Sequence, residues 1–92
     1  MSNNNTETTA LRLGDSITGF YFDVPFSGKL VGFEGVGMTV RLAAPIVVMG
    51  RTEDQNIWLK NNESNRRQIV VTSSPGVTED QISESDGYVF LR

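Results

Sequence analysis

Three basic side chains in the second half of the chain could contact phosphate groups, namely Lys60, Arg66 and Arg67. They flank the polar segment Asn61–Asn65. Lysine and arginine bind the nucleic-acid backbone, and a neighbouring aromatic ring can stack on a base. Trp58 or Tyr21 could supply that ring. The pattern gives one hypothesis for function, an auxiliary nucleic-acid-binding domain that uses residues 57–67.

The charge of the chain argues against this hypothesis. Its net charge is −3, whereas domains that bind nucleic acid are usually basic. Glu63 lies inside the polar segment itself, and residues 76–92 carry four acids against the single base Arg92. We therefore interpret the three bases first as charges that keep an exposed hairpin from pairing edge to edge with other chains.

The densest aromatic cluster comprises Phe20, Tyr21, Phe22 and Phe26. Successive side chains of a strand point to opposite faces, so we expect Phe20 and Phe22 in the core with Val24, and Tyr21 on the surface. Phe26 is expected to complete the core. Exposed aromatic side chains often mark protein interfaces. Tyr21 and Trp58 are therefore the candidate protein-binding residues, with burial in the core as the alternative for Trp58.

The chain contains neither histidine nor cysteine. Zinc sites built from those residues, disulfides, cysteine nucleophiles and the commonest general base are thereby excluded. The acidic pairs Glu53-Asp54 and Glu79-Asp80 occupy positions typical of turns and helix starts, without the regular spacing of a calcium loop. The sequence thus predicts no enzyme, no metal site and no cofactor.

Gly32, Gly35 and Gly37 resemble the spacing of a phosphate-binding loop, which requires a helix directly after the glycines. Residues 38–43 instead alternate between apolar and polar side chains, which is typical of a strand. We therefore predict a tight hairpin turn at 35–37. Met38, Val40 and Leu42 should then point to one face of the following strand.

Apolar residues alternate along most of the chain, which predicts strands at 18–24, 29–34, 38–43, 46–49, 57–60, 66–72 and 88–91. The unbroken apolar run Ile46–Met49 should be buried on both faces or cross between sheet halves. Gly50–Asn56 is expected as a turn. Strands 57–60 and 66–72 are expected to pair as a hairpin across Asn61–Asn65.

Thr78 and Gln81 match a capping box, with Val77 and Ile82 at the positions of a hydrophobic staple. This predicts one short helical element near residues 79–84, before the final strand that follows the turn at Asp86-Gly87. The pattern favours an all-β fold, a small SH3-like barrel of five or six antiparallel strands with an OB-like barrel as the alternative. Such a fold-level analogy implies no function.

Residues 1–10 are mainly Asn, Thr and Ser, and we expect them to form a disordered leader before a single domain at 11–92. The first residues lack the pattern of a signal peptide, and no apolar run reaches the roughly 18 residues of a membrane helix. These features predict a cytoplasmic protein with no membrane partner. The leading hypothesis is a non-enzymatic interaction or assembly module that binds a protein partner or its own copies through exposed sheet edges.

Overall fold

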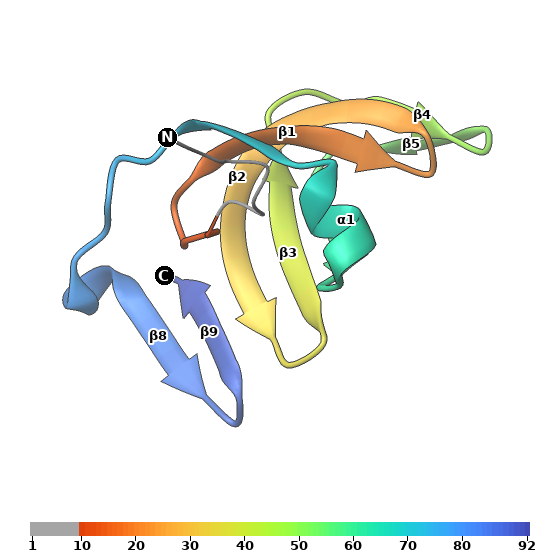
Figure 1. Ribbon diagram of the computed structural model, residues 1–92. Coiled ribbons are helices and arrows are strands. Elements are labelled where there is room, and N and C mark those ends of the chain that lie inside the picture. The colour runs from red at the N-terminus through yellow and green to blue at the C-terminus, as the bar shows by residue number, and fades with distance from the viewer. Residues whose placement is uncertain (1–9) are drawn as a thin grey trace.

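The computed structural model describes residues 10–92 (Figure 1). The prediction of a disordered leader lies outside these residues apart from Ala10. Nine strands make up most of the described residues: β1 (Ser16–Tyr21), β2 (Val24–Glu34), β3 (Gly37–Leu42), β4 (Ile46–Val48), β5 (Arg51–Glu53), β6 (Asn56–Lys60), β7 (Val70–Ser73), β8 (Ile82–Ser85) and β9 (Tyr88–Leu91). Two short helical elements interrupt them, α1 (Glu63–Arg67) and the 3-10 turn η1 (Glu79–Gln81). The predicted all-β class is confirmed.

The long strand β2 organises the main sheet, whose order is β6-β3-β2-β1-β7. On one side β2 pairs with β3, and on the other side it pairs with two strands in succession. β1 pairs with the first part of β2, at Val24–Lys29, and β9 pairs with the last part, at Gly32–Glu34. β8 joins the far side of β9, and the β8–β9 hairpin extends away from the other strands (Figure 1). Every pairing is antiparallel.

The sheet is open. β6 pairs only with β3 and β7 pairs only with β1, so within residues 10–92 no strand pairing joins the two ends of the sheet. The predicted hairpin between 57–60 and 66–72 is wrong, because α1 separates β6 from β7 and each strand pairs elsewhere. The side chain of Asn62 caps α1 by accepting from the N–H of Asn65 at 2.8 Å. Glu63 in the first turn and the two arginines in the last turn also favour a helix.

The core lies on one face of the sheet, where β1, β2, β3 and β6 meet. Met38, Val40 and Leu42 point inward as predicted, and Met38 and Val40 are completely buried. Phe26 is buried as expected. The remaining members of the buried cluster are Ile17, Leu30, Ile57, Leu59 and Ile69.

The alternation predicted for β1 is wrong. The strand ends at Tyr21, and Phe22 and Asp23 form a two-residue turn in which both residues have positive φ, 49° and 65°. Tyr21 packs against the core, while Phe20 and Phe22 are 48% and 61% exposed. The inward position before Tyr21 is Gly19, and the ring of Phe26 fills the space beside it. The core therefore takes Phe26 in place of Phe20.

The apolar run Ile46–Met49 is not buried on both faces, contrary to expectation. Val48 is buried, but Val47 and Met49 are 60% and 76% exposed. Met49 and Gly50 form another two-residue turn with positive φ, and Arg51–Glu53 continues as β5 where a turn was expected. The run is therefore one arm of a separate β4–β5 hairpin, which alternates between covered and exposed side chains.

The glycine turn and the capping box were predicted correctly. Glu34 pairs with Gly37 around a turn that begins at Gly35, where φ is 59°. The side chain of Gln81 accepts a hydrogen bond from the N–H of Thr78 at 2.9 Å. The helical turn is shorter than expected, because β8 begins at Ile82.

A buried carboxylate, Asp15, follows the turn at Leu13-Gly14. Asp15 is 1% exposed, and its oxygens accept from the N–H of Arg12 at 3.0 Å and from the hydroxyl of Ser74 at 2.5 Å. A buried carboxylate requires such donors because an unpaired one is costly to desolvate. Asp15 thus joins the beginning of β1 to the segment that follows β7.

Candidate functional site

A groove of about 470 Å³ lies between the tip of the β1–β2 hairpin and the end of β6. We call it the aromatic groove because four of its lining residues are Phe20, Tyr21, Phe22 and Trp58. Asp23, Lys60, Asn65 and Gln68 contribute polar atoms, the last two from α1 and its C-terminus. The structure therefore brings together three predicted site residues, Tyr21, Trp58 and Lys60.

The hairpin turn sets the arrangement of the β1 side of the groove. Tyr21 is half-buried against the core, and the ring of Phe22 meets it edge-on, with ring centroids 4.8 Å apart and planes at 75°. Edge-to-face contacts of this kind are the preferred geometry of aromatic pairs. Tyr21 was predicted to face outward, but it forms the inner wall of the groove, while Phe20 and Phe22 are the exposed residues.

Trp58 forms the opposite side of the groove. It is 43% exposed, on the outer face of β6, so it belongs to the surface and not to the core. Its ring lies directly over Gly37 on the neighbouring strand, and any side chain at that position would overlap the ring. The absence of a side chain at Gly37 therefore allows the tryptophan to lie flat on the sheet beside the groove.

The three predicted basic residues are not grouped. Lys60 lines the aromatic groove, whereas Arg66 is half-buried and Arg67 borders a separate hollow beside Glu63. Arg67 forms an ion pair with Glu63 at 2.9 Å, in which the two side chains are 68% and 70% exposed. This pair neutralises one of the bases, so Lys60 is the predicted cation that faces the groove.

Within residues 10–92, no strand pairs with the outer edge of β6, where the carbonyl of Lys60 accepts from Asn62 and Asn65. Leu42 donates to the carbonyl of Gln55, and Asn61 donates to the carbonyl of Val36, each at 2.7 Å. Antiparallel partners alternate along a strand, so the main chains of Ile57 and Leu59 face β3. The N–H and C=O of Trp58 consequently point away from β3, toward the free edge.

The end of β1 is also unpaired. Leu30 donates to the carbonyl of Asp15 at 2.9 Å, and the same alternation directs Gly19 and Tyr21 toward β2. The main chain of Phe20 therefore points away from β2. β7 covers β1 only as far as Thr18. Phe20 and Trp58 thus each place an exposed aromatic side chain and free main-chain groups at the groove.

The sequence placed Phe20 and Phe22 in the core because the alternation of inward and outward side chains was continued through the turn at Phe22-Asp23. Two signals could have corrected the count. Counting from Ile17 instead would have placed Phe20 outside, and Asp23 is a residue type that tolerates the left-handed conformation of a hairpin turn.

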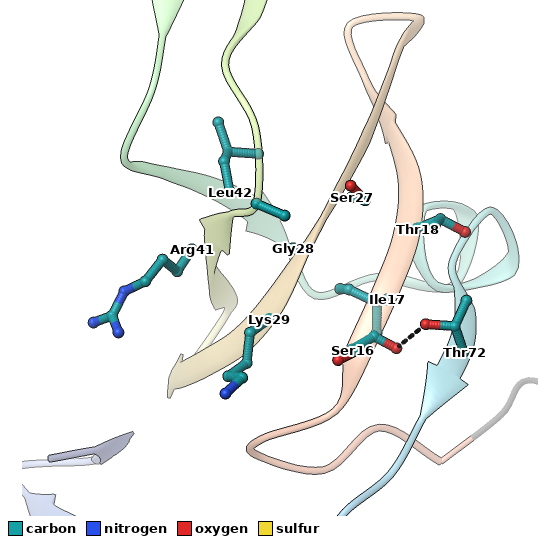
Figure 2. Close-up of a pocket in the computed structure, with 10 residues that line it drawn as sticks. Ser16, Ile17, Thr18, Ser27, Gly28, Lys29, Arg41, Leu42 and Thr72 are labelled. Carbon is teal, nitrogen blue, oxygen red and sulfur yellow. Dashed lines mark hydrogen bonds between the residues drawn. The ribbon is translucent and has the colours of Figure 1, made fainter.

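A second hollow, of about 330 Å³, lies on the outer face of β1, β2 and β3. Figure 2 shows Lys29 and Arg41 beside it, on adjacent strands where the two residues are direct partners in the β2–β3 register. Thr72 donates to the carbonyl of Ser16 at 3.1 Å on its other side. Both cations are exposed, so water can screen them, and the hollow has fewer apolar side chains than the aromatic groove.

A third hollow, smaller than the other two, is lined in part by Glu34 and Tyr88. Tyr88 on β9 is the register partner of Glu34 on β2. A hydrogen bond with Glu34, assisted by the negative charge of that carboxylate, raises the pKa of Tyr88 above its ordinary value. The interaction holds the start of β9 to the end of β2.

Within residues 10–92, no three acidic residues come close enough to hold a metal ion. No helix in this part of the chain is long and apolar enough to cross a membrane. The chain matches no protein-family model, no curated protein and no solved structure.

Proposed function

We propose that the chain is a non-enzymatic interaction module that binds an extended segment of a protein in the aromatic groove. The supporting observation is that Phe20 and Trp58, from distant parts of the sequence, combine exposed rings with unpaired main-chain groups around one groove. A bound strand gains affinity from main-chain hydrogen bonds and specificity from pockets for its side chains. The groove offers both.

The same proposal bears on the architecture. The free edge of β6 and the unpaired end of β1 flank the aromatic groove. An extended segment between them would continue the sheet toward closure. We accordingly keep the SH3-like barrel as the architectural proposal, with the OB-like barrel as the alternative, and regard the bound segment as a missing part of its wall.

Selection of peptides from a random display library tests the proposal. Peptides that bind the chain should lose at least tenfold in affinity when Trp58→Ser or Phe20→Ser is introduced, because each removes an aromatic contact. Val47→Ser is the matched control, since Val47 is 60% exposed but lies on the β4–β5 hairpin outside the groove. Peptides that bind all variants equally, or an absence of selectable binders, would contradict the proposal.

Nucleic acid remains a second candidate ligand because Lys60 shares the groove with Trp58. Asp23 in the groove and the Glu63–Arg67 ion pair oppose it by reducing the positive charge. Fluorescence anisotropy with labelled single-stranded oligonucleotides, at low and physiological salt, separates the two candidates. A nucleic-acid site requires that Lys60→Gln lower the salt slope by about one unit. We expect no measurable binding at physiological salt.

A further inference from the structure

In the part of the chain that the structure describes, the outer edge of β8 in the C-terminal hairpin is a second edge with which no strand pairs. Arg92 donates to the carbonyl of Gln81 at 3.0 Å, which continues the alternation of the β8–β9 register. Ser83 and Ser85 therefore direct their main chains toward β9, and the main chains of Ile82 and Glu84 point outward. β8 is the outermost strand of this extended hairpin (Figure 1), so its edge is accessible.

The two unpaired edges differ in charge. β8 and its flanking turns belong to residues 76–92, which contain four acids and one base. β6 carries one charged residue, Lys60, while Arg67 of the neighbouring α1 is paired with Glu63. Strand edges protected by like charges repel their own copies, whereas edges of opposite charge attract. An acidic edge and a basic edge therefore coexist on one molecule, at different places in the fold.

We propose that the segment bound beside the aromatic groove is β8 of a second copy of this chain, added to the edge of β6. This inference rests on the proposed function and names the partner of the same groove. Copies would associate head to tail, because the donated edge and the accepting edge are different surfaces of each molecule. The β8–β9 hairpin projects from the body, which leaves room for a neighbour to approach.

In one antiparallel register, the two edges can form main-chain hydrogen bonds and also bring opposite charges together. When Glu84 of one copy is opposite Trp58 of the next, the outward-facing N–H and C=O groups of these two residues pair with each other. Glu84 then lies diagonal to Lys60, within reach of two long side chains. The carbonyl of Lys60 already accepts from the side chain of Asn65 at 2.8 Å, so Trp58 is the better main-chain partner.

Charge reversal combined with sedimentation velocity tests this proposal. The wild-type chain should form species larger than the 10.1 kDa monomer, which grow with protein concentration and shrink with salt. Lys60→Glu alone and Glu84→Lys alone should each stay monomeric, because each variant has one edge of the wrong charge. The double variant should associate again, with the two charges exchanged.

A mixture of the two single variants gives the most specific outcome. The intact β8 edge of Lys60→Glu should pair with the intact β6 edge of Glu84→Lys, and the two altered edges should attract each other as they do in the double variant. Each variant still repels its own copies. The mixture should therefore form species in which the two variants alternate, which grow most at a one-to-one ratio, although each variant alone stays monomeric. A symmetric interface between identical surfaces would instead stop at a dimer.

Arg51→Glu and Asp54→Lys are the matched controls, since they make the same charge changes in the exposed β4–β5 region and the loop after it. They should associate as the wild type does, and thermal unfolding should show that all variants fold. A monomeric wild-type chain, or single variants that associate normally, would overturn the head-to-tail proposal. Peptides selected through Trp58 and Phe20 would still support protein binding in the groove, so the two proposals can fail separately.

Discussion

The strands β1 and β9 pair with the same side of β2. The β1–β2 and β8–β9 hairpins end in the same kind of turn, but the turn residues differ. Both residues of each turn have positive φ, 49° and 65° at Phe22-Asp23 and 51° and 82° at Asp86-Gly87. Asp-Gly is among the preferred pairs for such turns. A bulky aromatic residue at positive φ is an outlier. Only the first hairpin therefore carries backbone strain at its tip.

The strained turn lies at the aromatic groove and shapes one of its walls. The turn ends β1 at Tyr21, holds the ring of Phe22 edge-on to it and leaves Phe22 61% exposed at the aromatic groove. Strained backbone that persists is often found where a site requires a particular geometry. The first hairpin thus combines the less favourable turn with an aromatic wall, whereas the second hairpin has the more favourable turn.

Burial also separates the two hairpins. The first contributes Ile17, Phe26 and Leu30 to the core, with 1%, 5% and 0% of their surfaces exposed. The second has only half-buried and exposed residues. The free energy of folding should accordingly be concentrated in the first hairpin and in β3.

Shortening one apolar side chain in each hairpin should give the largest difference in the free energy of unfolding. Leu30→Ala is expected to lower the free energy of unfolding by about 2–5 kcal/mol, because it leaves a cavity beneath a closely packed sheet. Leu91→Ala in β9 should have a smaller effect, since Leu91 is half-buried and its surroundings can relax. Urea denaturation measures both. Equal losses would mean that the second hairpin is as integral to the core as the first.

The two glycines of β2 provide the next contrast. A Cβ at Gly28 would overlap the carbonyl oxygen of Arg41 on β3, whereas a Cβ at Gly32 would meet its nearest neighbour, in Phe90, at 3.5 Å. Gly28→Ala should therefore destabilise the fold by roughly 1–3 kcal/mol through overpacking. Gly32→Ala should be nearly neutral. A reversal of this order in thermal unfolding would contradict the close approach of β2 and β3 at Gly28.

Replacing the strained turn should stabilise the fold and weaken peptide binding. Phe22→Asn combined with Asp23→Gly introduces the favoured turn pair, and relief of strain should raise the free energy of unfolding by about 1 kcal/mol. The same double variant removes the exposed ring of Phe22 and should weaken the binding of peptides selected for the groove. Asp86→Asn at the other hairpin is the control and should change neither property. A destabilised double variant would mean that the contact of Phe22 with Tyr21 outweighs the strain.

The smallest expected effect concerns the attachment of β9 to β2. Glu34→Gln should lower the pKa of Tyr88 toward the ordinary value of about 10, because it removes the charge that favours the neutral phenol. In the wild type this interaction stabilises the fold below the unfolded-state pKa, and its contribution is lost as pH rises through the higher folded-state pKa. Tyrosinate absorbance in a Tyr21→Phe background follows the titration. An unchanged pKa would exclude the contact with Glu34.

Local patterns predicted the parts of the fold that local chemistry determines. The alternation of Met38, Val40 and Leu42 gave the correct inward face, since no bulge or turn interrupts β3. The turns at Gly35 and at Asp86-Gly87 contain residues that favour their dihedral angles. The link between Gln81 and Thr78 was likewise visible as a capping box.

The remaining features depend on contacts between distant segments. Tyr21 points inward because Gly19 and Phe26 share one place in the core, and alternation within β1 alone cannot reveal that exchange. The aromatic groove requires Phe20 and Trp58 to converge through the bend of the whole sheet. Lys60 lies in the groove with Trp58, whereas α1 turns Arg67 toward Glu63.

The ring of Trp58 lies over Gly37, and this contact has an evolutionary consequence. A side chain cannot be added at Gly37 while the ring occupies its place, and a smaller residue at position 58 would leave the glycine without a reason to persist. Strand positions otherwise favour β-branched and aromatic residues over glycine. The two positions should therefore vary together among descendants of a common ancestor, with glycine at 37 retained wherever tryptophan is retained at 58.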